Sequence, residues 1–426
     1  MSALPKDVGV SVIGVGSIGR CLVHQAQLTP RMQPLAIADV HLERATACAV
    51  MLGLEHCVVS TAAELHEALD RGVLAVTEDG GLLAASERTD VCFEATNALV
   101  PGYQHARTAL RHGQHVVMMN FEADLMFGTL LVDEAKRQGR VYTASDGDQP
   151  TAIKRVVDDI QLWGFELVVA GNMKGYHDQY VNPTTIAPEA DKRGLDHKMC
   201  SSYTDGTKMC VEMAVVANAL DMVAAKPGMH GPRIDHVLQI FDHIDIESNW
   251  REHGAFVDYV IGAEPKGGVF AIGYTESELQ RQTIGWYPPN MGPGPCYLFY
   301  RPFHLGAIEA MNCVVEAVCD GTARLQPNRH KTNVFAYAKH DLAAGDVVDG
   351  MGGYAAYGLI DNLDGGGGHV GLPILLADDV PLRRSIRKDE PILFDDVDMS
   401  RVDESLALYR DAVAAAPPQR TGKPKA

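Results

Sequence analysis

The first 147 residues alternate short apolar runs with segments in which apolar positions recur every three to four residues. Short apolar runs predict strands, and the periodic segments between them predict helices. The predicted strands are 8–13, 35–39, 91–96, 115–119 and 141–144, and the predicted helices are 21–28, 42–52, 62–71, 103–112 and 122–138. Because strands that alternate with helices are joined by right-handed crossovers, this pattern predicts an α/β fold with a doubly wound parallel sheet over residues 1–147.

A glycine motif follows the first predicted strand and opens the first predicted helix. In order, its residues are Gly14, Val15, Gly16, Ser17, Ile18 and Gly19. The first glycine permits a tight turn, the second lets a pyrophosphate approach the backbone, and the third lets the helix pack close to the strand. The helix N-terminus at Ser17 and Ile18 supplies N–H groups and a positive dipole to the phosphates. Between a strand and a helix, this motif predicts a Rossmann dinucleotide-binding domain.

The choice of cofactor depends on the end of the second predicted strand. That strand ends at Asp39, 25 positions after Gly14. A carboxylate there accepts hydrogen bonds from the adenosine ribose hydroxyls and repels a 2′-phosphate, so NAD is the predicted cofactor. Arg44, in the next predicted helix, keeps NADP open as an alternative. Further candidates for cofactor binding, which follow later strands, are Thr96, Asn97 and Asn120.

Residues 148–330 mix strands and helices in a different order. The predicted helices are 148–163 and 208–220, and the predicted strands are 165–170, 257–262, 268–274 and 296–300. This mixture predicts an α+β catalytic domain that binds the substrate and also dimerises through its sheet.

This central segment contains side chains that suit proton transfer. Hydride transfer needs a general acid or base beside the nicotinamide, and Lys174 and Lys208 are the candidates, because a desolvated ammonium can titrate near neutral pH. Asp205 and Glu212 would orient that lysine or bind substrate hydroxyls. The same carboxylates are candidate ligands of a divalent metal, a requirement that the sequence leaves open. For Lys208 and Glu212, four positions apart on a predicted helix, the alternative is a surface ion pair.

Charge limits the partners. The chain carries 55 acidic and 37 basic residues and a net charge of -18, which disfavours nucleic acid and anionic membranes. A small anionic substrate must therefore be held by a local group of basic and polar side chains. The candidate anion-binding residues are His230, Arg233, Tyr300, Arg301 and His304.

The remaining composition indicates a compartment. The nine cysteines are scattered without a CxxC pair, which is typical of buried thiols in a reducing environment. No apolar run approaches the roughly 20 residues of a membrane span, and no signal-peptide pattern precedes the first predicted strand. We therefore expect a cytoplasmic protein.

The last part of the chain is rich in turns. Residues 331–412 include a strand-like alternation at 333–338 and several glycine-containing turns, which predict a small β-rich domain. Paired prolines and scattered lysines predict a disordered tail over 413–426.

Several segments together carry a family resemblance. They are 115–120 with 122–124, 205–208 with 211–214, 228–233, 299–305, and 338–342 with 352–354. With them, the chain from about residue 8 to residue 399 resembles a homoserine-dehydrogenase-like oxidoreductase with a C-terminal SAF domain. That family includes the deoxyxylulose-5-phosphate reductoisomerase-like enzymes. The resemblance implies an NAD(P)-dependent enzyme acting on a CH–OH group, a SAF-like domain over 331–412, and a homo-oligomer, either a dimer or a tetramer.

Three functions stay open at this point. The leading hypothesis is a dehydrogenase that acts on a small polar hydroxy or oxo compound bearing a carboxylate or phosphate. The second is a reductoisomerase, which couples a rearrangement of the carbon skeleton to hydride transfer. The third is a non-catalytic protein that senses NAD.

Overall fold

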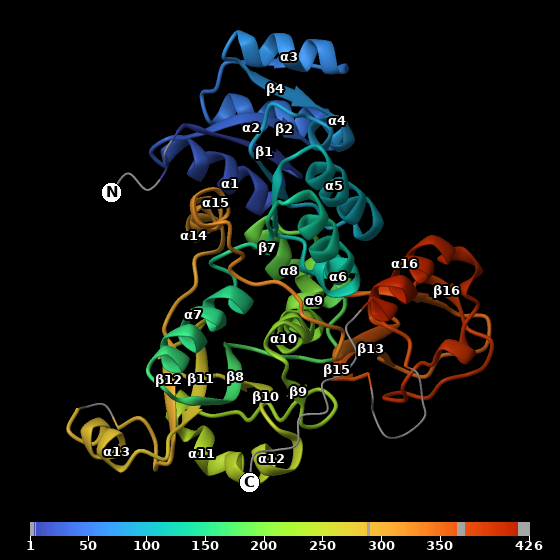
Figure 1. Cartoon of the computed structure of the whole chain (residues 1–426). Helices are drawn as coiled ribbons and strands as arrows, with labels where there is room; N and C mark the ends of the chain where they lie inside the picture. The colour runs from blue at the N-terminus through green and yellow to red at the C-terminus, as the bar shows by residue number, and fades with distance from the viewer. Residues whose placement is uncertain (1–3, 5, 288–289, 364–370, 416–426) are drawn as a thin grey trace.

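The computed structural model describes residues 4, 6–287, 290–363 and 371–415. Figure 1 shows an N-terminal domain at the top, a central domain below it and a C-terminal domain at the side. Within the described residues, these domains contain a seven-stranded sheet, a five-stranded sheet and a pair of two-stranded sheets respectively. The predicted α/β fold with a Rossmann-like parallel sheet is confirmed.

The N-terminal sheet is parallel throughout, in the order β3-β4-β2-β1-β5-β6-β7. Its strands are β1 (Val8–Ile13), β2 (Met32–Ala38), β3 (His56–Val58), β4 (Leu74–Thr77), β5 (Val91–Glu94), β6 (His115–Met118) and β7 (Tyr142–Ala144). Its helices are α1 (Ser17–Leu28), α2 (Leu42–Met51), α3 (Ala62–Asp70), α4 (Gly80–Ala84), α5 (Leu99–Arg111) and α6 (Phe121–Gln138). The direction of strand addition reverses between β1 and β5, and ligands of such sheets bind at the carboxyl ends of those strands. The short strands β3 and β4 were not among the predicted elements.

The central domain is built on a sheet in the order β12-β11-β8-β10-β9. Its strands are β8 (Glu166–Lys174), β9 (Val223–Ala224), β10 (Phe256–Ile261), β11 (Val269–Tyr274) and β12 (Cys296–Arg301). Its helices are α7 (Gln149–Leu162), α8 (Pro183–Arg193), α9 (His197–Thr204), α10 (Thr207–Leu220), α11 (Ile240–His243), α12 (Ile246–His253), α13 (Glu278–Ile284), α14 (Gly306–Glu309) and α15 (Met311–Val315). Helices α7 and α10 share a core with one face of the sheet, and α11 and α12 share a core with the other.

The C-terminal domain packs against α10 and α6. Its strands are β13 (Thr332–Ala338), β14 (Val347–Asp349), β15 (Ala356–Asn362) and β16 (Asp378–Pro381), and its helix is α16 (Asp403–Ala414). The prediction of a disordered tail from residue 413 is wrong at its start. Helix α16 continues to Ala414 because buried Ala412 packs on α6, where its carbonyl accepts a 3.0 Å hydrogen bond from Thr129. Residues 416–426 lie outside the described residues.

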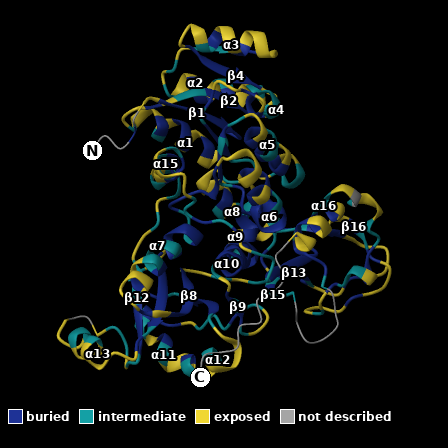
Figure 2. Cartoon of the chain, viewed as in Figure 1, coloured by how far each residue is buried: buried dark blue, intermediate teal, exposed yellow. Residues whose placement is uncertain are grey.

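Helix α10 lies at the centre of the molecule, where all three domains meet. Every residue from Thr207 to Ala219 is buried, and Figure 2 shows the helix enclosed by its neighbours. A polar side chain on α10 must therefore find a partner inside the protein or face a cavity. Within the described part of the chain, no helix is long and apolar enough to cross a membrane.

Candidate active site

A cavity of about 790 Å³ opens at the carboxyl ends of β1 and β5, the position that the strand order predicts for a ligand. Its walls come from the N-terminal domain and from α9 and α10 of the central domain. The predicted cofactor-binding residues that line it are Gly14, Gly16, Ser17, Ile18, Asp39, Thr96 and Asn97. Segments far apart in the sequence thus converge where a dinucleotide would lie.

The glycines form a cradle that fits a pyrophosphate. Gly14 has a φ of 91°, and a Cβ there would lie 2.8 Å from the backbone of Ala95 and Thr96. A Cβ on Gly19 would lie 1.8 Å from the Gly14 carbonyl oxygen, so Gly19 allows α1 to pack against the turn. At Gly16, an added Cβ meets no atom within 4 Å. Within the described residues no side chain caps α1, which leaves its N-terminal N–H groups for an anion.

Asp39 and Arg44 stand together in the wall of the same cavity. The Asp39 carboxylate is 6% exposed and accepts hydrogen bonds from the N–H groups of Val15 at 3.1 Å and His41 at 3.0 Å. Arg44 Nη1 lies 3.3 Å from Asp39 Oδ1, and the Arg44 side chain is half exposed. A ribose hydroxyl would meet the carboxylate here, whereas a 2′-phosphate would meet the guanidinium. The structure therefore keeps both NAD and NADP open.

Asn120 does not line the cavity, unlike the other late candidates Thr96 and Asn97. It is 1% exposed, its Oδ1 accepts the N–H of Ala123 at 3.0 Å, and its Nδ2 donates to the Ala98 carbonyl at 2.9 Å. Its amide caps α6 and ties that helix to the loop after β5. Asn120 therefore shapes the site from behind, which corrects the prediction that it contacts the cofactor.

Lys208 lies at the inner end of the cavity, where it meets Glu122 of α6. The Lys208 Nζ to Glu122 Oε1 distance is 2.6 Å, and the two residues are 8% and 6% exposed. The ammonium also lies 5.5 Å from the centroid of the Phe121 ring, and Tyr203 of α9 completes this wall. A largely buried ion pair thus faces the cavity that holds the glycine cradle.

Glu212 lies one turn further along α10 and joins a second ion pair. Its Oε2 accepts hydrogen bonds from Lys174 Nζ and from Asn172 Nδ2, each at 3.3 Å. Burial raises the pKa of the Glu212 carboxyl, and the Lys174 ammonium opposes part of that rise. The alternative of a surface ion pair between Lys208 and Glu212 is wrong, because both side chains are buried and each has a partner on another element.

The charge of Lys208 differs from the sequence-based expectation. Burial acts to lower its pKa, but the carboxylates of Glu122 and Glu212 outweigh burial and raise the pKa above its ordinary value. The prediction that Lys208 titrates near neutral pH is therefore wrong. Desolvation favours the neutral amine only where no carboxylate stands nearby, and here two do. Lys208 is therefore protonated at neutral pH, and it lines the cavity.

Asp205 is not brought to the cavity. It is 1% exposed, its Oδ1 accepts the N–H of Thr207 at 2.9 Å, and its Oδ2 lies 2.9 Å from Lys339 Nζ in the C-terminal domain. The carboxylate is used to join the start of α10 to that domain. This position corrects the prediction that Asp205 orients the catalytic lysine by direct contact or binds substrate.

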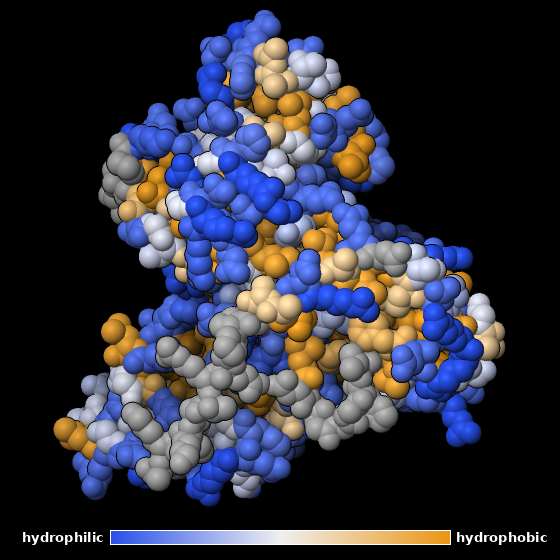
Figure 3. Space-filling model, turned by 45° about the vertical axis from the view of Figure 1, so that its right-hand side comes forward, coloured by the Kyte–Doolittle hydropathy of each residue, from blue (hydrophilic) through white to orange (hydrophobic). Residues whose placement is uncertain are grey.

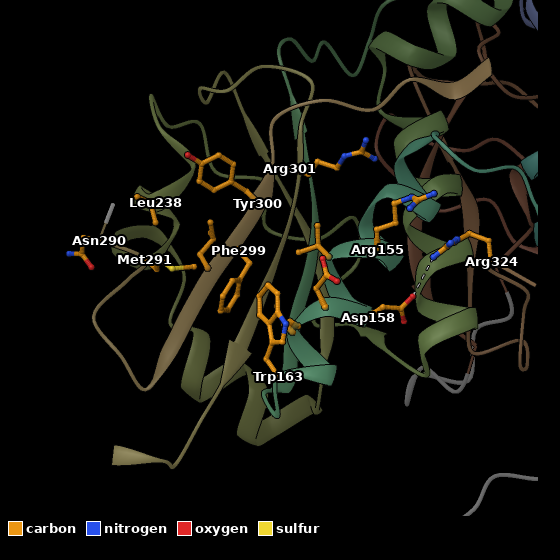
Figure 4. A pocket seen from close by; sticks show the side chains of 14 residues that line it. Arg155, Asp158, Trp163, Leu238, Asn290, Met291, Phe299, Tyr300, Arg301 and Arg324 are labelled. Carbon is orange, nitrogen blue, oxygen red and sulfur yellow. Dashed lines mark ion pairs between the residues drawn. The ribbon is translucent and has the colours of Figure 1, made fainter. Parts of the chain in front are cut away.

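The predicted anion-binding residues do not surround one point. Tyr300 and Arg301 are neighbours on β12, so their side chains leave opposite faces of the sheet. Both line another cavity, of about 740 Å³, at the edge of the central sheet, where Figure 4 shows them pointing apart. Arg301 Nη1 lies 2.7 Å from Glu309 Oε2, which neutralises the charge that a substrate anion would need. The structure thus contradicts a shared role for these two residues.

His230 and Arg233 also separate. His230 Nδ1 lies 2.5 Å from Oδ2 of buried Asp258 on β10. Asp258 is three positions before Ile261 on that strand, so the side chains of Asp258 and Ile261 leave opposite faces of the sheet. Arg233 is exposed, and its backbone forms an isolated β-bridge with Ile261 of β10. Ile261 is in turn the backbone partner of Lys174 on β8. Two strand spacings, about 10 Å, therefore separate Arg233 from Lys174. Arg233 stays a candidate for a substrate anion, whereas His230 is held in its loop by Asp258.

Three residues near the ionic site were not predicted to act there. Glu122 comes soon after β6, at the carboxyl edge of the sheet, and this position could have indicated a site residue. The residues around Glu122 in the sequence are mostly apolar, so the position did not stand out. Tyr203 of α9 is 43% exposed and lines the same cavity as Lys208. Asp148 begins α7, and its Oδ1 lies 3.9 Å from Nδ1 of His304, which keeps that predicted residue close to the site. Nothing local in the sequence distinguished Tyr203 or Asp148.

A metal site is not evident from these side chains. Within the described residues, no three His, Cys, Asp or Glu side chains are grouped so that they could hold a metal ion.

Comparison with known proteins adds a family to this geometry. Residues 147–310 match the family model described as oxidoreductase DRL, catalytic domain, which covers less than half of the chain. No curated protein matches significantly. The match supports an oxidoreductase, and the glycine cradle supports a nicotinamide cofactor for it.

Solved structures with similar folds are distant. A magnesium-bound DOX-P reductoisomerase is 17% identical, with a TM-score of 0.35, over 48% of this chain and 56% of that chain. The 1-deoxy-D-xylulose 5-phosphate reductoisomerase from Zymomonas mobilis with NADPH is 17% identical, with a TM-score of 0.35, over 49% and 57%. A probable dehydrogenase from Thermotoga maritima is 12% identical, with a TM-score of 0.41, over 74% and 90%. The chain thus spans little more than half the length of these reductoisomerases, and the resemblance to homoserine dehydrogenases and SAF domains stays a prediction.

Proposed function

We propose that this oxidoreductase transfers a hydride between a nicotinamide dinucleotide and a small hydroxy or oxo compound that bears a carboxylate or phosphate. One observation carries the proposal: the glycine cradle and the Lys208–Glu122 ion pair line the same cavity. A dinucleotide on the cradle would accept or supply the hydride. Substrate would then lie between the nicotinamide end of that cavity and α10.

Lys208 is the residue that acts on the substrate oxygen. Its ammonium donates a hydrogen bond to the carbonyl oxygen, on which negative charge develops as the hydride arrives, and it is the proton source for that oxygen. Glu122 keeps the ammonium charged and in position. In this proposal Lys174, which is paired with Glu212, binds a second polar group of the substrate, and Arg233 binds its anionic end.

A reductoisomerase is the second candidate, and the acidity of the site favours it. The carboxylates of Glu122 and Glu212 both raise the pKa of Lys208, and the carboxylate of Asp148 raises the pKa of Glu212. Within the described residues these carboxylates do not form a metal site by themselves, so a divalent cation would have to be brought in with substrate, which would supply further ligands. This function would require metal-dependent turnover and a rearranged carbon skeleton in the product.

Two measurements test the proposal. Calorimetric titration with NADH and NADPH asks whether the cradle binds a dinucleotide, and the absence of binding of either would refute the proposal. A panel of hydroxy acids, oxo acids and phosphate esters, followed by nicotinamide absorbance with and without Mg²⁺, then separates the two candidates. Turnover without added metal favours the dehydrogenase. Lys208→Met should abolish turnover while cofactor affinity persists.

A further inference from the structure

We propose that Lys339 of the C-terminal domain is a positioning residue for the active site, because through Asp205 it holds the start of α10 and the wall of the cofactor cavity. The proposal rests on the proposed function and gives the C-terminal domain a part in it. Lys339 itself does not line the cavity. Its effect passes through Val181 and Asp205, which flank the α8–α9 hairpin that lines the cavity, and through the start of α10.

Lys339 is buried, and its ammonium contacts three acceptors from different segments of the chain. The residue is 5% exposed, and its Nζ lies 2.9 Å from Asp205 Oδ2. The same ammonium donates to the carbonyl oxygens of Val181 at 2.6 Å and Gly353 at 2.8 Å. The ammonium thus makes two hydrogen bonds to backbone carbonyls and one ion pair with a buried carboxylate. A lysine is rarely buried to this extent unless such partners compensate its charge.

Only two residues, Gly206 and Thr207, separate Asp205 of this ion pair from Lys208. Asp205 accepts the N–H of Thr207, the first residue of α10, and Gly206 between them has a φ of 87°. The Thr207 hydroxyl oxygen in turn accepts the N–H of Gly358 on β15 at 2.8 Å. Two contacts from the C-terminal domain thus hold the first turn of α10. A shift of that turn would move the Lys208 ammonium away from Glu122.

The C-terminal domain also holds the outer side of the cavity wall. The α8–α9 hairpin contributes to that wall, and its cavity-lining residues are Gly194, Leu195, Asp196, Met199 and Tyr203. On its other side the hairpin contacts the C-terminal domain through a 2.8 Å Thr184–Tyr354 hydrogen bond and a 3.0 Å Lys198–Asp378 ion pair. In the space-filling view, hydrophobic residues are visible where the C-terminal domain meets the rest of the molecule (Figure 3). The hairpin thus lies between the C-terminal domain and the cavity.

A matched control exists at the other end of the same helix. Lys331, also in the C-terminal domain, lies 3.1 Å from Asp221, which ends α10. This pair is more exposed and does not line the cavity. Both lysines join one domain to one helix, but only Lys339 does so beside Lys208. A general loss of domain docking would follow from either substitution, whereas a loss of positioning would follow from Lys339 alone.

The experiment compares Lys339→Met with Lys331→Met in the full chain. NADH affinity is measured by calorimetry, and hydrogen exchange is measured by mass spectrometry for peptides within residues 194–212. For Lys339→Met we expect exchange in these peptides to rise and NADH affinity to fall by about tenfold, which corresponds to about 1.4 kcal/mol of binding free energy. Lys331→Met should leave both at wild-type values.

Two outcomes overturn the proposal: wild-type NADH affinity and exchange in Lys339→Met, or equal losses in both variants. If Lys339→Met does not fold, the double variant Lys339→Met with Asp205→Asn removes both buried charges. The proposal expects it to fold with weakened NADH binding, and wild-type affinity there also overturns it. If the wild-type protein binds no dinucleotide, the proposed function fails, whereas hydrogen exchange in residues 194–212 still tests the positioning role.

Discussion

Replacing Lys208 by Met should destabilise the protein, because Glu122 loses its partner, and should abolish turnover, because the substrate loses the ammonium. These two effects can be measured separately. The Lys208 ammonium lies 2.6 Å from Glu122 Oε1, and both residues are less than a tenth exposed. Removing one member of such a pair leaves a buried charge without compensation, which typically costs about 3–5 kcal/mol. Because 1 kcal/mol corresponds to about 2–4 °C for domains of 150–250 residues, we expect the Tm to fall by roughly 10 °C in a calorimetric scan.

The double variant Lys208→Met with Glu122→Gln distinguishes the loss of stability from the loss of turnover. Gln has nearly the shape of Glu without its charge, so most of the lost stability should return. Turnover should stay absent, because no ammonium faces the substrate. NADH titration is the control, and both variants should bind as the wild type does. A single variant with the wild-type Tm, or a double variant no more stable than the single one, would refute the buried ion pair as the cause.

Four further predictions follow from other parts of the structure. Gly16→Val should fold normally by circular dichroism but lose NADH binding, because its side chain would fill the open cradle; Gly19→Val should unfold at lower temperature, because its Cβ meets backbone. Asp39→Ala should shift the ratio of NADH to NADPH affinity toward NADPH, since the carboxylate no longer opposes a 2′-phosphate beside the neighbouring arginine. Burial raises the pKa of Asp124 from 3.8 to about 6, so the wild type loses stability as pH rises through this range, and Asp124→Asn should be the more stable protein above pH 6 but not below pH 4 in thermal scans. We also expect a homo-oligomer, because β12 is a sheet edge, and light scattering that gives a mass of 46.1 kDa would contradict it.

The sequence alone determined the parts of this protein that depend on local patterns. The glycine motif and Asp39 lie within one strand–helix–strand unit, so their spacing carried both the fold and the cofactor site. Helix α10 was likewise expected at 208–220 and spans Thr207–Leu220, because this mostly apolar segment contains no glycine or proline that would interrupt a helix. Strands β3 and β4 were not predicted, although β5, β6 and β7 are equally short and were predicted.

Only the tertiary structure decided which charges meet. Lys208 pairs with Glu122, 86 positions away, instead of Glu212 on its own helix, and Asp205 pairs with Lys339 in another domain. These partners set the charge state of Lys208, since a buried ammonium loses its proton or keeps it according to the carboxylates around it. The same holds for Arg301, whose basic character suggested an anion site but whose charge Glu309 neutralises. Residue type specifies which charge states and contacts are open to a side chain. Which of them the protein uses depends on nearby charged groups, and these groups come from distant segments of the chain.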